Sequence, residues 1–465
     1  MSFLIVVAAL CFLMFVAYRG YSVILFAPIA ALGAVLLTDP ALVAPMFTGL
    51  FMDKMVGFLK LYFPVFLLGA VFGKLIEISG FSKSIVAATI KVVGAQRAML
   101  SIVLVCALLT YGGVSLFVVV FAVYPFAAEL FRQSDIPKRL IPGTIALGAF
   151  TFTMDALPGT PQIQNIIPTS FFGTTGWAAP VLGTLGGVFI LLLGMSYLEW
   201  RRRVAMRAGE GYGGDLRNEP ETFRGDKLAH PLIAILPLVL VGVANFAFTK
   251  FIPGFYGHSQ SFVPAVIGNP APVIQEVSKV AAIWAVQGAL LVGIAAVILF
   301  AWRPVIASFA EGTRSAIGGA LLASMNTASE YGFGAVIAAL PGFLVVANAL
   351  HAIPNPLVNE AVSVTALAGI TGSASGGMSI ALAAMADSFI ANANAAGIPM
   401  EVLHRVAAMA SGGMDTLPHN GAVITLLAVT GLTHRQSYKD VFAITVIKTL
   451  AVFFIIGLYY ATGLV

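Results

Sequence analysis

Apolar stretches, each about as long as a membrane-spanning helix, follow one another along the chain. A helix needs about 20 mostly apolar residues to cross a bilayer, and these stretches are too continuous for the alternating strands of a membrane barrel. The pattern predicts an all-α polytopic membrane protein with about 12 transmembrane helices. The stretches lie near residues 3–17, 21–38, 57–79, 98–131, 141–157, 178–200, 229–249, 277–302, 315–349, 360–392, 405–432 and 440–463.

The composition agrees with a lipid environment. Apolar residues make up 59% of the chain and charged residues 10%, and the mean hydropathy is +0.97. A soluble domain carries about a quarter charged residues, so this chain lacks the polar surface that water requires. The net charge of +5 is spread over short loops. We therefore expect the lipid bilayer, and no nucleic acid, as a partner.

The basic residues predict an orientation in the membrane. The sequence RRRVAMR at 201–207 opens the one long polar stretch, residues 201–228. Positively charged loops stay in the cytoplasm, so we expect this stretch to be a cytoplasmic linker. No basic segment precedes the first apolar stretch, so we expect it to be a retained helix and not a cleaved signal peptide. A multi-pass protein of the cell's inner (plasma) membrane is the expected location.

The sequence also repeats itself. MDALPGTP at 154–161 returns as MDTLPHNG at 414–421, and GGVS at 112–115 returns as GGMS at 376–379. The order and spacing of the paired phrases predict an internal duplication. We expect the first copy, with an extra leading helix, in residues 1–200 and the second copy in residues 229–465. An odd number of crossings in each copy would make them inverted repeats, a common construction of secondary transporters.

Each copy is expected to contain two interrupted helices. Glycine weakens a helix and proline removes one of its hydrogen bonds, so we expect breaks at 112–115 and 155–160 and at 376–379 and 415–420. The N-terminal ends of broken helices hold anions well. The repeated phrases therefore predict one central site for a small carboxylate. The alternative for the glycine pairs is close packing of helices.

Ionisable residues inside apolar stretches are costly and are candidates for function. Asp155 and Asp415 are candidates for binding sodium or carrying a proton, although either could instead cap a helix. His419 can titrate near neutral pH and has no equivalent in the first copy, where Gly159 stands. We expect these two aspartates and this histidine to couple ions to transport. Glu330, a charged residue in the apolar stretch 315–349, is a further candidate.

Further polar and glycine residues complete the expected site. Gln162 and Asn165 are candidates for reading substrate hydroxyls, with hydrogen bonding between helices as the alternative. Cys11 and Cys106 lie in apolar stretches without metal-binding spacing, and we expect no metal, cofactor or catalytic residue. The expected substrate-binding residues are Gly112, Gly113, Ser115, Asp155, Gly159, Thr160, Gln162, Asn165, Gly376, Gly377, Ser379, Asp415, His419 and Asn420.

With GGVS, DIPKRL (135–140), MDALPGTPQ, GGMS and MDTLPHNG in this order, the chain resembles the gluconate permease family of proton symporters within the ion-transporter superfamily. Gluconate-type members carry His-x-x-Leu-Pro-Pro-His-Pro-Gly where this chain has MDALPGTP. It is therefore closest in appearance to the branch of D-β-hydroxybutyrate permeases. The resemblance implies coupling to protons, re-entrant hairpins, a scaffold and a transport domain, an elevator mechanism and a homodimer.

These observations favour a symporter that imports a small hydroxy-monocarboxylate, and not an enzyme. No ATP-binding phrase of the form G-x-x-x-x-G-K-[ST] is present, so we expect ion-driven transport. A symporter of gluconate or another sugar acid with protons, or a sodium-coupled carboxylate transporter, is the alternative. A channel and an intramembrane aspartyl protease are more distant alternatives. For a protease the residue order in GGMD (412–415) does not match the Gly-x-Gly-Asp pattern.

Overall fold

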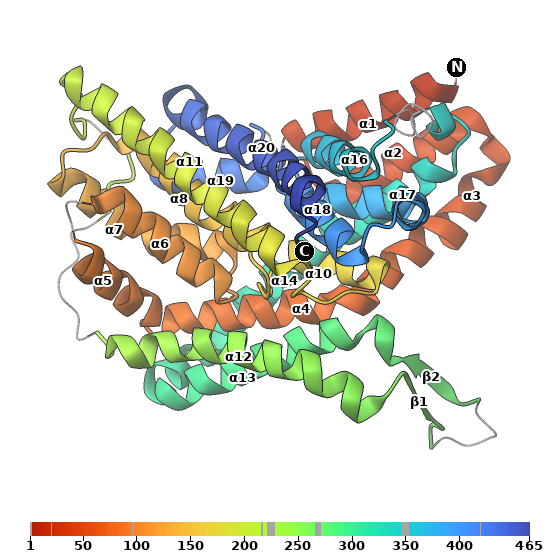
Figure 1. Cartoon of the computed structure of the whole chain (residues 1–465), viewed down its shortest axis with the longest axis horizontal. Helices are drawn as coiled ribbons and strands as arrows, with labels where there is room; N and C mark the ends of the chain where they lie inside the picture. Colours follow the sequence, from red (N-terminus) through yellow and green to blue (C-terminus); the bar gives the residue numbers. More distant parts are fainter. Residues whose placement is uncertain are drawn as a thin grey trace.

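The chain folds into a bundle of helices with one small β-hairpin (Figure 1). The computed structural model describes residues 2–19, 21–94, 97–214, 217–220, 228–265, 271–345, 353–418 and 420–465. The predicted fold class, an all-α polytopic membrane protein, is confirmed. By length and composition alone, six helical segments among the described residues can cross a membrane: Pro40–Ile78, Pro180–Arg207, Pro231–Tyr256, Ala281–Phe300, Ala374–Ala395 and His434–Thr462.

The first half of the chain runs from α1 to the long apolar helix α11. In chain order they are α1 (Ser2–Tyr18), α2 (Val23–Thr38), α3 (Val43–Met46), η2 (Phe47–Phe51), α4 (Met52–Ile78), α5 (Phe81–Val93), α6 (Ala98–Tyr111), α7 (Leu116–Gln133), α8 (Ile141–Ala149), α9 (Phe152–Asp155), α10 (Ile163–Phe172) and α11 (Pro180–Arg207).

The second half contains the hairpin and the longest helix of the described chain. Its elements are α12 (Pro231–Tyr256), β1 (Ser259–Phe262), β2 (Val273–Glu276), α13 (Ala281–Phe300), α14 (Trp302–Ala339), α16 (Pro356–Thr371), α17 (Ala374–Ala395), α18 (Met400–Ser411), α19 (Gly421–Thr430) and α20 (Lys439–Thr462). α14 packs along α4 and α2, and α12 pairs with α13. This last pair and the hairpin form the lower edge of the molecule in Figure 1.

Several of the apolar stretches are interrupted, as the sequence predicts. Residues 98–131 form α6 and α7, and residues 405–432 fall on α18 and α19. The helices α6, α7, α8, α10 and α11 are followed in the second half by α16, α17, α18, α19 and α20, with breaks at corresponding points. This shared order supports the predicted duplication, and the inverted orientation of the two copies stays a prediction. α11 continues to Arg207, so the helix extends into the predicted linker.

One predicted break was wrong. The break in the second copy lies at Gly372 and Ser373, because α16 ends at Thr371 and Gly372 takes a left-handed conformation with φ 66°. The phrase GGMS at 376–379 lies inside the continuous helix α17. Its glycines serve close packing: a Cβ atom on Gly377 would overlap the backbone of Ala368 in α16. Glycine in a membrane helix can either take a left-handed conformation at a break or allow close packing of two helices. The pair at 376–377 allows close packing.

Charged side chains at one end of the bundle connect the polar segment after α11 to both halves. The buried carboxylate of Asp440 accepts hydrogen bonds from Arg201 Nε (2.6 Å) and Tyr197 Oη (2.8 Å). Arg139 donates to both carboxylate oxygens of Glu210, at 2.6 and 2.8 Å, and thereby lowers the pKa of that carboxyl. Lys138 pairs with Glu219 at 2.7 Å. These contacts hold the described part of the segment against the helix ends.

The contact between α16 and α17 predicts a specific sensitivity. Replacing Gly377 by alanine should lower the free energy of unfolding by about 1–3 kcal/mol, because the added methyl group meets backbone that cannot move aside. Gly318→Ala is the matched control, since nothing lies within 4 Å of a Cβ atom there. Thermal unfolding in detergent, followed by tryptophan fluorescence, would measure both. Equal stability of the two variants would contradict the close packing.

Candidate functional site

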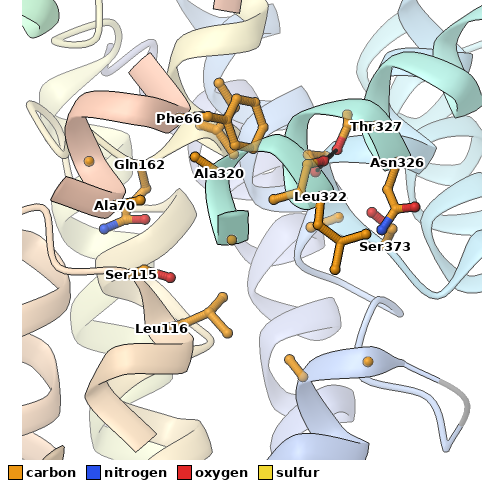
Figure 2. A pocket seen from close by; sticks show the side chains of 18 of the residues that line it. Phe66, Ala70, Ser115, Leu116, Gln162, Ala320, Leu322, Asn326, Thr327 and Ser373 are labelled. Atoms are coloured by element: carbon orange, nitrogen blue, oxygen red, sulfur yellow. Dashed lines mark hydrogen bonds between the residues drawn. The ribbon is translucent and has the colours of Figure 1, made fainter. Parts of the chain in front are cut away.

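A cavity of about 990 Å³ is lined by residues from both halves of the chain. α4 contributes Phe66, Gly69 and Ala70 to its wall, and α14 contributes a polar group that includes Asn326 and Thr327. Figure 2 shows Ser115 and Leu116 on one side of this cavity, with Asn326, Thr327 and Ser373 across from them. The wall therefore combines apolar surface with a few hydroxyl and amide groups, which is typical of a site for a small molecule.

The N-terminal ends of α7, α10, α17 and α19 all reach this cavity. Each of these helices begins directly after a break, and the amide groups of a first turn have no partner within their own helix. The four ends therefore direct partial positive charge toward the same space. Their residues on the wall are Ser115 and Leu116 (α7), Gln162, Ile163 and Gln164 (α10), Ser373, Ala374 and Ser375 (α17), and Asn420, Gly421 and Ala422 (α19).

The two breaks in each copy are joined by an amide side chain. Nε2 of Gln162, just before α10, donates to the carbonyl oxygens of Thr110 (2.7 Å) and Val114 (3.3 Å). Nδ2 of Asn420, just before α19, donates to the carbonyl oxygen of Gly372 (2.6 Å). Gln162 thus satisfies carbonyl groups where α6 ends, and Asn420 satisfies one where α16 ends. The two predicted copies therefore contain the same kind of hydrogen bond at matching places, from a side-chain amide to a backbone carbonyl group.

Asn420 also caps its own helix, since its Oδ1 accepts from the backbone N–H groups of Ala422 (2.6 Å) and Val423 (3.0 Å). Spacing from the repeated aspartates suggests Thr160 as its counterpart in the first copy. The structure gives that position to Gln162, because α10 begins after two additional residues, Thr160 and Pro161. The Thr160 hydroxyl donates instead to the carbonyl oxygen of Thr153 (2.8 Å) and does not reach the cavity wall.

Asp415 lies on the cavity wall and forms an ion pair with Lys448 of α20. Both side chains are almost completely buried, and Lys448 Nζ also donates to the carbonyl oxygen of Phe150 (3.2 Å). This carbonyl group belongs to the residue that follows α8, in the other copy. Lys448 therefore connects the Asp415 break of the second copy to the end of a helix in the first.

Asp155 lies behind the wall and is also buried. Neither of its carboxylate oxygens has a hydrogen-bond partner within the part of the chain that the structure describes. The carboxylate fills the space that a side chain on Gly412 would occupy, so it faces the break of the second copy. Lys448, Asp415 and Arg405 are the charged groups that act on it. The two aspartates of the repeated phrases thus come from different copies to one buried cluster.

Arg405 of α18 is fully buried and binds protein carbonyl groups. Its guanidinium donates to the backbone oxygens of Ala178 (2.7 Å) and Asp155 (3.0 Å) and to Oδ1 of Asn165 (3.1 Å). Nδ2 of Asn165 donates to the carbonyl oxygens of Thr160 (2.9 Å) and Gly176 (2.8 Å). These bonds hold the segment between α9 and α11 in place. In this structure Asn165 is occupied with protein partners and lies off the cavity wall.

The substrate-binding residues expected from the sequence divide into those that line the cavity and those that do not. Gly113, Ser115, Gln162, Asp415 and Asn420 line the cavity. The others that the structure describes lie behind the wall: Gly112, Asp155, Gly159, Thr160, Asn165, Gly376, Gly377 and Ser379. Gly112 packs against Leu238, and Gly159 packs with φ 78° against Trp177. His419 lies outside the described residues. Whether these residues contact a substrate or an ion stays a prediction.

Sequence reasoning missed Lys448 and Arg405. Both lie within apolar stretches, at 440–463 and 405–432, where a cation is as costly as an acid. The same rule that selected the two aspartates would therefore have selected their buried cationic neighbours. Glu360 on α16, which is also buried, was missed as well, whereas the buried Glu330 on α14 is a candidate from the sequence.

Comparison with known proteins places the chain among transporters. No model of a protein family matches it. It is 60% identical over 474 aligned positions to the uncharacterized transporter YxjC of Bacillus subtilis (strain 168), with 100% of both chains covered. The chain belongs to this transporter family. A crystal structure of the YdaH transporter of Alcanivorax borkumensis, described as having an unusual topology, aligns with a TM-score of 0.48 and 14% identity. That alignment covers 92% of this chain and 90% of the other.

The protein is thus a multi-pass membrane transporter. Membership of the gluconate permease family in particular stays a prediction, since the relative is named only as a transporter. The homodimer expected from the resemblance also stays a prediction.

The ion pair between Asp415 and Lys448 yields a testable expectation. Lys448→Met leaves a buried carboxylate without its cation and should destabilise the fold by about 3–5 kcal/mol. The double variant Lys448→Met with Asp415→Asn removes both charges and should regain part of that loss. Lys74→Met is the control, because its partner Glu77 is 41% exposed and such pairs contribute at most about 1 kcal/mol. Thermal unfolding of the wild type and the three variants measures these effects. A Lys448→Met variant as stable as the wild type would contradict this account.

Proposed function

We propose that this transporter is a secondary active symporter that imports a small hydroxy-monocarboxylate, such as 3-hydroxybutyrate, together with protons. The observation that carries the proposal is the convergence of four helix N-terminal ends on one cavity. Such ends bind carboxylates through free backbone amides and through the helix dipole. They also occur at the substrate sites of transporters with discontinuous helices.

The charges on the cavity wall agree with an anion held by backbone groups. Among the described residues of the wall, Lys74 is the one cationic side chain, and Glu77 neutralises it at 2.8 Å. Asp415 is neutralised by Lys448. A carboxylate substrate would therefore find its positive partner at the helix ends. The hydroxyl group of Ser115 and the amide group of Asn326 are available for a substrate hydroxyl, and Phe66 and Leu116 for its apolar part.

Coupling to protons follows from the family resemblance and from the buried acids. Asp155 and Asp415 come from the two copies to one cluster with Lys448 and Arg405. A change in the protonation of such a cluster alters the charge that holds both breaks. An elevator movement of a transport domain that carries the four half-helices would alternately expose the cavity. This movement also follows from the resemblance.

A proteolytic function receives less support from the site. An aspartyl dyad needs two carboxylates that share one proton in contact with substrate. Asp415 is instead paired with Lys448, and Asp155 does not reach the cavity wall. We therefore propose transport without catalysis.

Uptake into proteoliposomes tests the proposal. Labelled D-3-hydroxybutyrate should accumulate with an inward proton gradient, and unlabelled gluconate should not compete. Accumulation driven only by a sodium gradient would assign the coupling to sodium. Uptake of gluconate without uptake of hydroxybutyrate would keep a carboxylate site and overturn the proposed substrate. Absence of carboxylate uptake under either gradient would contradict the function as a whole.

The variant Asn420→Ala tests whether uptake depends on the N-terminal end of α19. The change removes the cap of α19 and the bond to Gly372, and should lower uptake about tenfold, which corresponds to about 1.4 kcal/mol of lost binding. Asn355→Ala is the matched control, because Asn355 caps α16 by accepting from Val358 N–H (3.0 Å) and lies away from the cavity wall. Equal losses in the two variants would show that the effect is general destabilisation.

A further inference from the structure

A further buried acid, Glu330 of α14, lies on the cavity wall with 3% of its surface exposed. Its carboxyl group has no cationic partner among the described residues, and Oε2 has no hydrogen-bond partner there. The other acids of the wall, Glu77 and Asp415, are each paired with a lysine. Glu330 is therefore the wall acid whose charge is left without compensation from a side chain.

The carboxyl group of Glu330 lies at the beginning of α17. The side chain of Ser373, the N-cap residue of that helix, is the neighbouring polar group that acts on it. Ser373 Oγ accepts from the backbone N–H of Gly376 at 3.1 Å, so its own hydrogen remains to be donated to Glu330. The hydroxyl group thus connects the carboxyl group to the first turn of α17.

Gly376 shows how closely the acid approaches this helix. A Cβ atom on Gly376 would overlap Oε2 of Glu330. The first glycine of the GGMS phrase therefore leaves room for a carboxyl group from another helix, as its neighbour Gly377 leaves room for α16. Glu330 occupies the position at the N-terminus of α17 where an anionic ligand would be expected to bind.

Among the residues that the structure describes, no other titratable group is placed to compensate Glu330. The elements packed against α14 are α2, α4, α13, α17 and η2. α2, α13 and η2 contain no titratable residue, and α17 contains only Asp387, which is exposed. On α4, Lys74 and Glu77 pair with each other, whereas Asp53, Lys54, Lys60 and Tyr62 do not line the cavity. α14 itself adds Arg303, Glu311, Arg314 and Tyr331, and none of these lines the cavity.

We propose that Glu330 must take up a proton before a carboxylate can bind at the N-terminus of α17, so that proton and substrate enter the cavity together. Two carboxylates at one site cannot both remain charged without a high cost. A neutral Glu330 removes this repulsion and frees the helix end for the substrate. The proposal rests on the proposed carboxylate transport and assigns its proton coupling to a residue outside both repeated Asp phrases.

Binding of D-3-hydroxybutyrate to the purified full-length protein, measured by calorimetry between about pH 5.5 and 8, tests the assignment. When one proton must bind with the ligand, the affinity falls about tenfold per pH unit above the titration of that group. The wild type should show this slope. Glu330→Gln keeps the shape of the side chain without its charge, and its affinity should stay at the acidic wild-type value across the range.

Two further variants separate coupling from folding. Glu330→Asp keeps a titratable carboxyl group and should keep a pH-dependent affinity. Glu311→Gln changes another glutamate of α14, and should keep the wild-type slope because Glu311 is exposed and does not line the cavity. If Glu330→Gln retained the wild-type slope, the role of Glu330 would be overturned while carboxylate binding stood. If the wild type bound neither D-3-hydroxybutyrate nor gluconate at any pH, the proposed function and this inference would both fall.

Discussion

Four helices of this transporter begin inside its apolar body, and the backbone groups at these ends must find partners where lipid offers none. Much of the central architecture follows from this requirement. Gln162 and Asn420 satisfy carbonyl groups across the breaks of their own copies. Arg405 satisfies the carbonyl groups of Asp155 and Ala178. A substrate carboxylate is the proposed partner for the N–H groups at the cavity that Asn420 and Ser373 do not cap, so the same requirement links the fold to the function.

The buried charges divide into those that stabilise the breaks and those available for coupling. Lys448 pairs with Asp415 and donates to the carbonyl oxygen of Phe150. It therefore connects the break at Asp415 to the end of α8. Arg405 holds the segment before α11 through neutral groups. Asp155, Glu330 and Glu360 remain without ion pairs among the described residues, and of these three Glu330 is the one that lines the cavity. Burial of an acid is costly unless it is neutralised, which agrees with the proposal that Glu330 takes up the transported proton.

The sequence predicts the fold class and most of the breaks because glycine, proline and polar residues interrupt otherwise continuous apolar stretches. It misplaces the break at Gly372 and Ser373, because a glycine pair can serve either a positive φ or a close approach, and only the neighbouring helix α16 decides between them. Spacing likewise selects Thr160 over Gln162, since the start of α10 depends on two additional residues. The meeting of Asp155 with Gly412 depends on contacts between distant segments, which a repeat pattern does not encode.

The central claim is that the ends of α7, α10, α17 and α19 form one site for a small carboxylate. The most direct measurement is anomalous diffraction from crystals grown with a bromine-substituted 3-hydroxybutyrate. The account predicts one bromine peak inside the cavity, with the carboxylate of the ligand facing Ser115, Ser373 and the first turns of the half-helices. An ordered ligand bound elsewhere, with the cavity left without it, would contradict the account.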